Sequence, residues 1–169
     1  MYREWRQWRP LHGCRGRGDG GMKYSAGIFC LALTLLASSA YCADTGKDLF
    51  LNNCAACHQS NGNGQAGLAP PLTNKRLWQG MGDGRTQYIA GVALTGLVGK
   101  IVSEGETYSD LAMPPQNHLS DGELALVANY IFNDLNGIDT HAAGEDFART
   151  RAAPPSHAKI MMMRDAALK

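Results

Sequence analysis

The sequence has 169 residues, of which 44% are hydrophobic and 18% are charged, and its formal net charge is +1. This length suits one globular domain with additional processing segments. From Asp44 onward the chain has ten Lys and Arg against thirteen Asp and Glu, a net charge of −3. Because this part is mildly acidic and has no run of like charges, we expect neither nucleic acid nor an anionic membrane as a partner.

Residues 1–21 and 22–42 are predicted to lie outside the folded domain. The first segment has five arginines and two tryptophans without apolar periodicity, and we interpret it as a non-native upstream extension or else as a lengthened leader. The second is predicted to be a signal peptide, because Met22 and Lys23 precede an apolar run at 26–37 that is too short to anchor the chain in a bilayer. The sequence therefore predicts export and no stable membrane anchor.

The distribution of the five cysteines agrees with export. Cys14, Cys30 and Cys42 lie within or at the edge of the leader, for which cleavage is expected after Ala40 or Cys42. A lipid anchor on Cys42 is disfavoured, since Tyr41 stands where such signals have a small residue. The two cysteines that remain belong to a single motif, so no disulfide framework is expected.

A domain at 44–137 is predicted to open with a helix. Thr45 and Asp48 resemble a capping box, and Gly46 and Phe50 lie on one face of the helix that follows. The lack of a side chain at Gly46 would allow another helix to approach closely. This first helix would run directly into the next motif.

Residues 54–58 read Cys-Ala-Ala-Cys-His, the C-x-x-C-H pattern of haem c attachment. The thiols of Cys54 and Cys57 would add to the two vinyl groups of haem, and the imidazole of His58 would bind the iron. A structural zinc site needs four ligands, but no second Cys pair follows; a thioredoxin-type pair is expected near a βαβ pattern, and none surrounds this segment. The motif therefore predicts one covalently bound haem c and its iron.

The rest of the domain is predicted to consist of helices joined by loops. Residues 59–73 are rich in Gly and Pro and would form a loop around the ring, whereas 85–95 has the spacing of a short helix. Ser120 and Glu123 form a full capping box before a longer amphipathic helix, which Gly137 would end. We expect this last helix to cross the first one and to form the core with it.

The sixth ligand of the iron separates an electron carrier from a catalyst, and Met113 is the candidate. It lies in a loop stiffened by the two prolines that follow it, although core packing is the ordinary role of a methionine. His118, Met81 and the methionines at 161–163 are rivals. His118 is expected at the surface or in a loop, Met81 as a gap filler, and 161–163 on a helix far along the chain.

The order of these motifs resembles class I cytochrome c, in its bacterial periplasmic branch. The resemblance covers about 44–137 and rests on these positions: Gly46, Phe50, Cys54, Cys57, His58, Pro70, Pro71, Leu72, Met113, Pro114 and the capping box at 120–123. It implies an all-α fold in which short helices and loops wrap one haem and the N- and C-terminal helices cross. Residues 96–101, Tyr108, Met113 with Pro114, and 119–125 are also similar to the cytochrome subunits and domains that serve bacterial dehydrogenases.

The resemblance also implies roles for residues beside the haem. The carbonyl of Pro70 would accept the Nδ1 proton of His58 and hold the ring in orientation. Trp78 would donate to a haem propionate, with a half-buried position in the core as the alternative. Tyr108 would similarly cover the side of the haem on which Met113 lies.

The function that follows from these expectations is one-electron transfer in the periplasm, not catalysis. A dehydrogenase would donate electrons, and an oxidase or another cytochrome would accept them, with the protein either free or a subunit of that dehydrogenase. Transfer would occur at the exposed haem edge, through a small and transient interface. The alternative is a haem enzyme or gas sensor with an open sixth position on the iron.

Residues 138–169 extend beyond the minimal domain. A break at two consecutive prolines precedes Ser156, which would begin a helix with a methionine-rich face. Two hypotheses follow. The extension either packs back on the domain or frays, or else it is a docking arm that covers an apolar patch on a dehydrogenase; the second is preferred.

Overall fold

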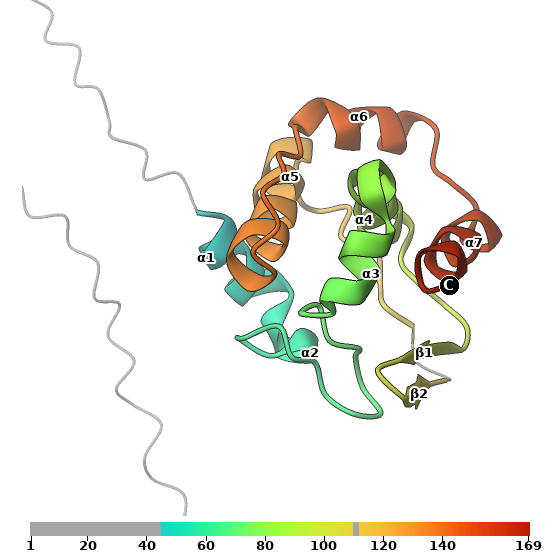
Figure 1. Ribbon diagram of the computed structural model, residues 1–169. Coiled ribbons are helices and arrows are strands. Elements are labelled where there is room, and N and C mark those ends of the chain that lie inside the picture. The colour runs from blue at the N-terminus through green and yellow to red at the C-terminus, as the bar shows by residue number, and fades with distance from the viewer. Residues whose placement is uncertain (1–44, 110–111) are drawn as a thin grey trace, which may run out of the picture. The chain divides into compact units, whose positions relative to one another are not determined.

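Helices form most of the computed structural model, which describes residues 45–109 and 112–169 (Figure 1). The upstream extension, the signal peptide and the cleavage site concern positions outside the described residues, so they stay predictions. In chain order the elements are α1 (Gly46–Asn53), α2 (Ala55–His58), α3 (Lys75–Gly80), a 3₁₀ turn (Gly82–Gly84), α4 (Arg85–Thr95), β1 (Ile101–Ser103), β2 (Glu106–Tyr108), α5 (Asp121–Asn129), a π-helical turn (Tyr130–Leu135), α6 (Gly144–Ala152) and α7 (His157–Ala167).

Both predicted capping boxes form, and they start α1 and α5. The hydroxyl of Thr45 accepts from the backbone N–H of Asp48 at 3.2 Å, and the Asp48 carboxylate accepts from the backbone N–H of Thr45 at 3.3 Å. Ser120 and Glu123 bond in the same reciprocal way. Such boxes satisfy N–H groups that a helix leaves without partners at its start. Local sequence therefore sets where both helices begin.

The predicted crossing of the first and last helices of the domain is confirmed. A Cβ built on Gly46 would lie 2.2 Å from the backbone oxygen of Leu126, so the two backbones approach more closely than any other residue allows. Phe50 and Tyr130 meet beside this contact with their ring centroids 5.2 Å apart. Gly137, with a φ of 64°, ends the helical run after the π-helical turn, as expected of a residue in the left-handed region.

A small hairpin adds strand to the predicted all-helical fold. Ile101 pairs with Tyr108 and Ser103 with Glu106, so each strand is only three residues long. The turn between them has positive φ at both central residues, 52° at Glu104 and 86° at Gly105, which suits the right-handed twist of a hairpin. Strands this short carry too little alternation to be recognised in the sequence.

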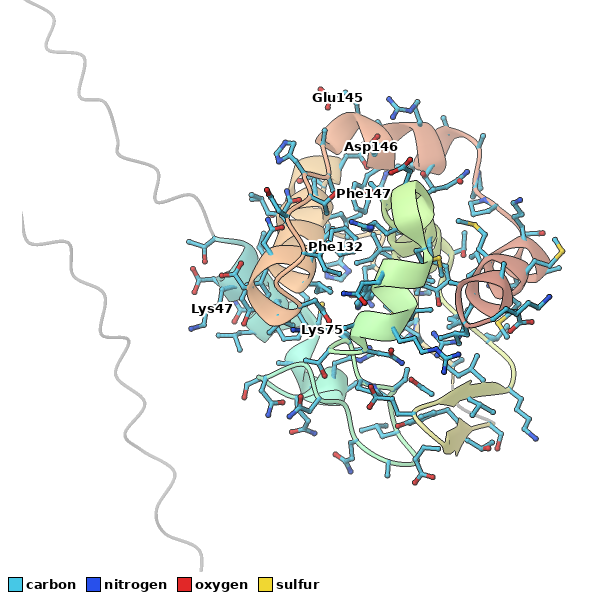
Figure 2. All side chains as sticks on the ribbon, in the orientation of Figure 1. Lys47, Lys75, Phe132, Glu145, Asp146 and Phe147 are labelled. Carbon is cyan, nitrogen blue, oxygen red and sulfur yellow. The ribbon has the colours of Figure 1, made fainter. Side chains whose placement is uncertain are left out.

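The C-terminal extension packs back on the domain. Helix α6 contacts α4 and α5, and α7 contacts α3 and α4. Phe147 of α6 and Ile160 of α7 have no exposed surface, and Figure 2 shows Phe147 on the inner side of α6. Met163 packs against the core of its own chain, whereas Met162 is 60% exposed, so a role of the extension as a docking arm stays a prediction.

Replacement of Gly46 by Ala is expected to lower the free energy of unfolding by about 1–3 kcal/mol, because the new methyl group meets the Leu126 backbone. Gly122→Ala is the matched control: Gly122 lies in the first turn of α5, and a Cβ there meets nothing within 4 Å. That control should be neutral or stabilise by about 0.4–1 kcal/mol. Urea unfolding measures both, and equal stabilities of the two variants would contradict the close crossing.

Candidate functional site

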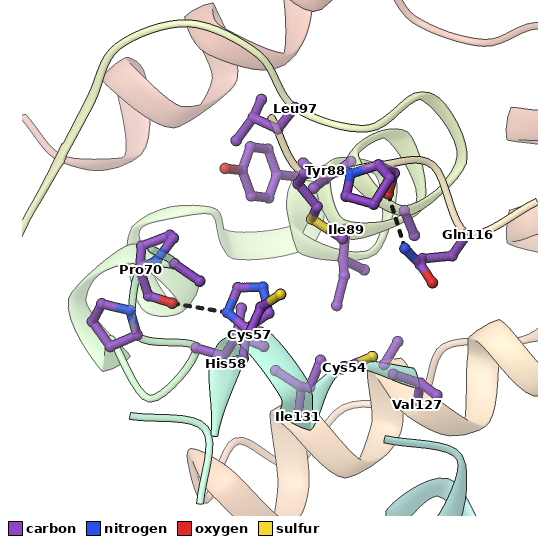
Figure 3. A pocket seen from close by; sticks show the side chains of 18 of the residues that line it. Cys54, Cys57, His58, Pro70, Tyr88, Ile89, Leu97, Gln116, Val127 and Ile131 are labelled. Atoms are coloured by element: carbon purple, nitrogen blue, oxygen red, sulfur yellow. Dashed lines mark hydrogen bonds between the residues drawn. The ribbon is translucent and has the colours of Figure 1, made fainter. Parts of the chain in front are cut away.

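A cavity lies between the helices, and its lining is mostly apolar. The volume of the cavity is about 230 Å³. Figure 3 shows part of the lining, with Cys54, Cys57 and His58 on one wall and Tyr88 and Leu97 across from them. The cavity is therefore enclosed by elements far apart in the sequence, from α2 to the hairpin and α7.

His58, at the end of α2, is buried and held in one orientation. Its Nδ1 lies 2.9 Å from the carbonyl oxygen of Pro70, to which it donates (Figure 3). Burial lowers the pKa of His58 below its ordinary value, and the bond to Pro70 opposes this shift only in part. The imidazole is therefore neutral, and its Nε2 lone pair is free to bind a metal.

The loop that carries Pro70 is fixed by its own backbone. Gln65 and Ala69 form an isolated β-bridge, with N–O distances of 2.9 and 3.0 Å. The N–H of Gly64 donates to the carbonyl of His58 at 2.9 Å, and the φ of Gly64 is 68°. A Cβ at Gly64 would lie 2.4 Å from the Ala69 oxygen, so glycine permits the tight return of the chain to His58.

Cys54 and Cys57 present their thiols along the same wall as His58. Cys54 is half-buried, Cys57 is exposed, and neither forms a disulfide. Burial, with the neighbouring Cys57 as a second cause, raises the pKa of Cys54 to about 11. One thiol of the pair therefore lies inside the cavity wall and the other at its rim. Both belong to the turn of chain that leads into His58.

Met113 lines the cavity from a loop that the backbone holds in place. It forms an isolated β-bridge with Leu97, with N–O distances of 3.0 and 2.9 Å. Gly96 has a φ of 74°, and a Cβ there would lie 2.4 Å from the Met113 oxygen. Leu97 lies across the cavity from His58 in Figure 3, and Met113, its bridge partner, also lines the cavity.

The rival ligands lie elsewhere. His118 is exposed and its Nε2 is 3.0 Å from Oδ1 of Asn53, on the surface as expected. Met81 packs against the core, and Met162 is 60% exposed. Among the described residues that line the cavity, His58 and Met113 are the only imidazole and thioether groups.

Trp78 and Tyr108 both line the cavity, and their roles beside the haem stay predictions. Trp78 is only 2% exposed, and its indole N–H donates to the carbonyl of Leu72 at 2.7 Å. The indole N–H that was expected to donate to a propionate therefore donates within the protein. This agrees with the alternative of a core tryptophan, except that Trp78 is buried and not half-buried. Tyr108, in β2, is buried beside the cavity.

Arg164 is a lining residue that sequence reasoning missed. It belongs to α7, is 4% exposed, and donates from Nη1 to the Tyr88 hydroxyl at 3.3 Å and from Nη2 to the Val102 carbonyl at 3.2 Å. The sequence carried one signal for it. Arg164 lies four residues after Ile160, which places a charge on the buried face of α7.

The donor set of the cavity fits a covalently attached haem. Two thiols, a neutral imidazole with a free Nε2 and a thioether share one apolar cavity, and these are the groups that attach a porphyrin and ligate its iron. The carbonyl of Pro70 supplies the outer hydrogen bond that iron-binding histidines ordinarily make.

Comparison with known proteins agrees with this donor set. Residues 43–133 match the family model described as cytochrome c. The chain is 35% identical over 101 residues to cytochrome c-552 of Thermus thermophilus, an alignment that covers 60% of this chain and 67% of that protein.

A second relative is much longer than this chain. The cytochrome c subunit of a quinone-type alcohol dehydrogenase from Gluconobacter oxydans is 33% identical over 132 residues, which cover 74% of this chain and 26% of that subunit. The family match agrees with the C-x-x-C-H motif and with the cavity beside it. This chain belongs to the cytochrome c family, whose haem c is bound covalently, here through Cys54 and Cys57.

Proposed function

We propose that the protein is an exported one-electron carrier in which His58 and Met113 would bind the haem iron. The observation that carries this proposal is the sharing of one apolar cavity by both groups, with the rival ligands outside it. When bound, the haem supplies an iron that exchanges a single electron. Membership of the cytochrome c family supports electron transfer as the role.

The contribution of the chain is to hold both ligands still. The Nδ1 hydrogen bond to Pro70 prevents rotation of the His58 ring. The β-bridge with Leu97 holds the backbone of Met113, and the next two residues are prolines. Ligands that are fixed before electron transfer need little rearrangement during it, and a thioether ligand favours the reduced iron.

The partner we propose is a periplasmic dehydrogenase, with an oxidase or another cytochrome as acceptor in the respiratory chain. The similarity to a cytochrome subunit of a dehydrogenase supports this choice, either as a free carrier or as a subunit. Two residues of the cavity lining are open to solvent, since Cys57 is exposed and Leu68 is 38% exposed, so the site is reachable from outside. Transfer there needs only a small, transient interface.

Replacement of Met113 by Ala is expected to leave the iron with an open position, because no other described lining residue offers a thioether. The variant should bind carbon monoxide when reduced and lose the weak far-red band of methionine ligation when oxidised. Visible absorption with and without carbon monoxide measures both effects. The wild-type protein should not respond to carbon monoxide.

His118→Ala is the matched control for that experiment, since His118 is exposed and bonded to Asn53. It should keep the wild-type spectrum in both oxidation states. A wild-type protein that itself binds carbon monoxide readily would contradict Met113 ligation and favour the alternative, a haem enzyme or gas sensor.

Export is proposed from the apolar leader, and among the described residues no helix is long and apolar enough to span a membrane. The intact mass of the protein from a periplasmic extract should equal the chain from residue 41 or 43 onward plus one haem. A haem-free protein that retains Lys23 and is found in the cytoplasm would contradict export and periplasmic attachment.

A further inference from the structure

Arg164 is a buried cation for which residues 45–109 and 112–169 provide no acidic partner. The ion pairs formed by the described residues join Arg149 to Asp146 and Arg151 to Asp121, and neither includes Arg164. It donates to two neutral oxygens, the hydroxyl of Tyr88 and the carbonyl of Val102. A guanidinium remains charged in proteins and has five N–H donors, so these two bonds leave both its charge and much of its donor capacity uncompensated.

Burial of such a charge is unfavourable unless an anion balances it. Glu104 and Glu106 belong to the nearby hairpin, but both are exposed and neither pairs with Arg164. The side chain of Arg164 lines the haem cavity instead. The balancing anion is therefore expected inside the cavity.

The position of Arg164 agrees with one edge of the haem. The two vinyl groups of a protoporphyrin lie on one half of the ring and its two propionates on the other half, so thiols that attach the vinyls direct the propionates away from them. Tyr88, which accepts from Arg164, lies across the cavity from Cys54 in Figure 3. Arg164, bonded to Tyr88, therefore reaches the cavity away from the thiols, as the partner of a propionate must.

We propose that Arg164 is the ion-pair partner of a haem propionate and a positioning residue that raises the reduction potential. It acts from α7, which lies beyond residues 43–133, the part of the chain that matches the family model. A cation beside the haem disfavours the oxidised iron, which has the greater positive charge, and neutralises a carboxylate that would favour it. The C-terminal extension thereby becomes part of the haem site.

Arg164→Met tests this inference in the haem-loaded protein, because an apolar side chain of similar length can fill a buried arginine position without loss of the fold. The equilibrium between oxidised and reduced iron should shift roughly tenfold toward the oxidised form, a fall of about 59 mV for one electron. The unpaired propionate should also titrate closer to neutral pH, so the potential should rise as the pH falls. Arg164→Lys, which keeps the charge, should restore most of both properties.

Arg149→Met is the matched control, since it removes the same charge from the same extension at a side chain that is 72% exposed. It should leave the potential and its pH dependence unchanged. If Arg164→Met does not fold, Arg164→Gln gives the same readout while still donating to Tyr88 or Val102. A folded, haem-loaded neutral variant with the wild-type potential at every pH would overturn the proposal.

This inference rests on the haem in the cavity but not on Met113 as its ligand. The visible spectrum separates the two proposals, because loss of Met113 ligation changes the response to carbon monoxide, whereas Arg164 changes the potential at constant ligation. A wild-type protein without a reduced c-type band would remove the basis of both.

Discussion

The contact between α1 and α5 at Gly46 is the constraint on which the site depends. Gly46 lets the backbones touch, and α1 then leads without a loop into Cys54, so the position of the crossing fixes the position of the haem motif. The same α5 contributes Leu124 and Val127 to the cavity. A shift of this contact would therefore move the thiols and one apolar wall together, because both belong to the same pair of helices.

Local signals made much of this arrangement predictable. The capping boxes at Thr45 and Ser120, the glycine at 137 and the C-x-x-C-H motif each depend on a few neighbouring residues, and the structure has the expected local geometry at each. The distance between Nδ1 of His58 and Pro70 also agrees with the role that family resemblance implied. A motif whose residues lie within a short stretch of chain can be recognised from the sequence before the fold is known.

What the sequence did not reveal depends on contacts between distant residues. The indole N–H of Trp78 donates to the carbonyl of Leu72, which only the fold brings into reach. No short sequence motif indicates which elements α7 packs against. Even a visible cue, Arg164 one turn after Ile160, remained ambiguous because an arginine near a chain end is ordinarily exposed. The packing of the extension on its own domain was therefore one of two hypotheses that the sequence left open, and only the fold shows the contacts of α6 and α7.

The position of α7 has a consequence for biogenesis. The side chain of Arg76 donates to the carbonyl of Leu168 at 2.7 Å, a contact that joins residues 92 positions apart. Contacts of such long sequence separation form late, since loop closure must precede them. The motif at 54–58 thus precedes in the chain the segment that walls its cavity, so both thiols stay accessible for haem attachment until these late contacts form.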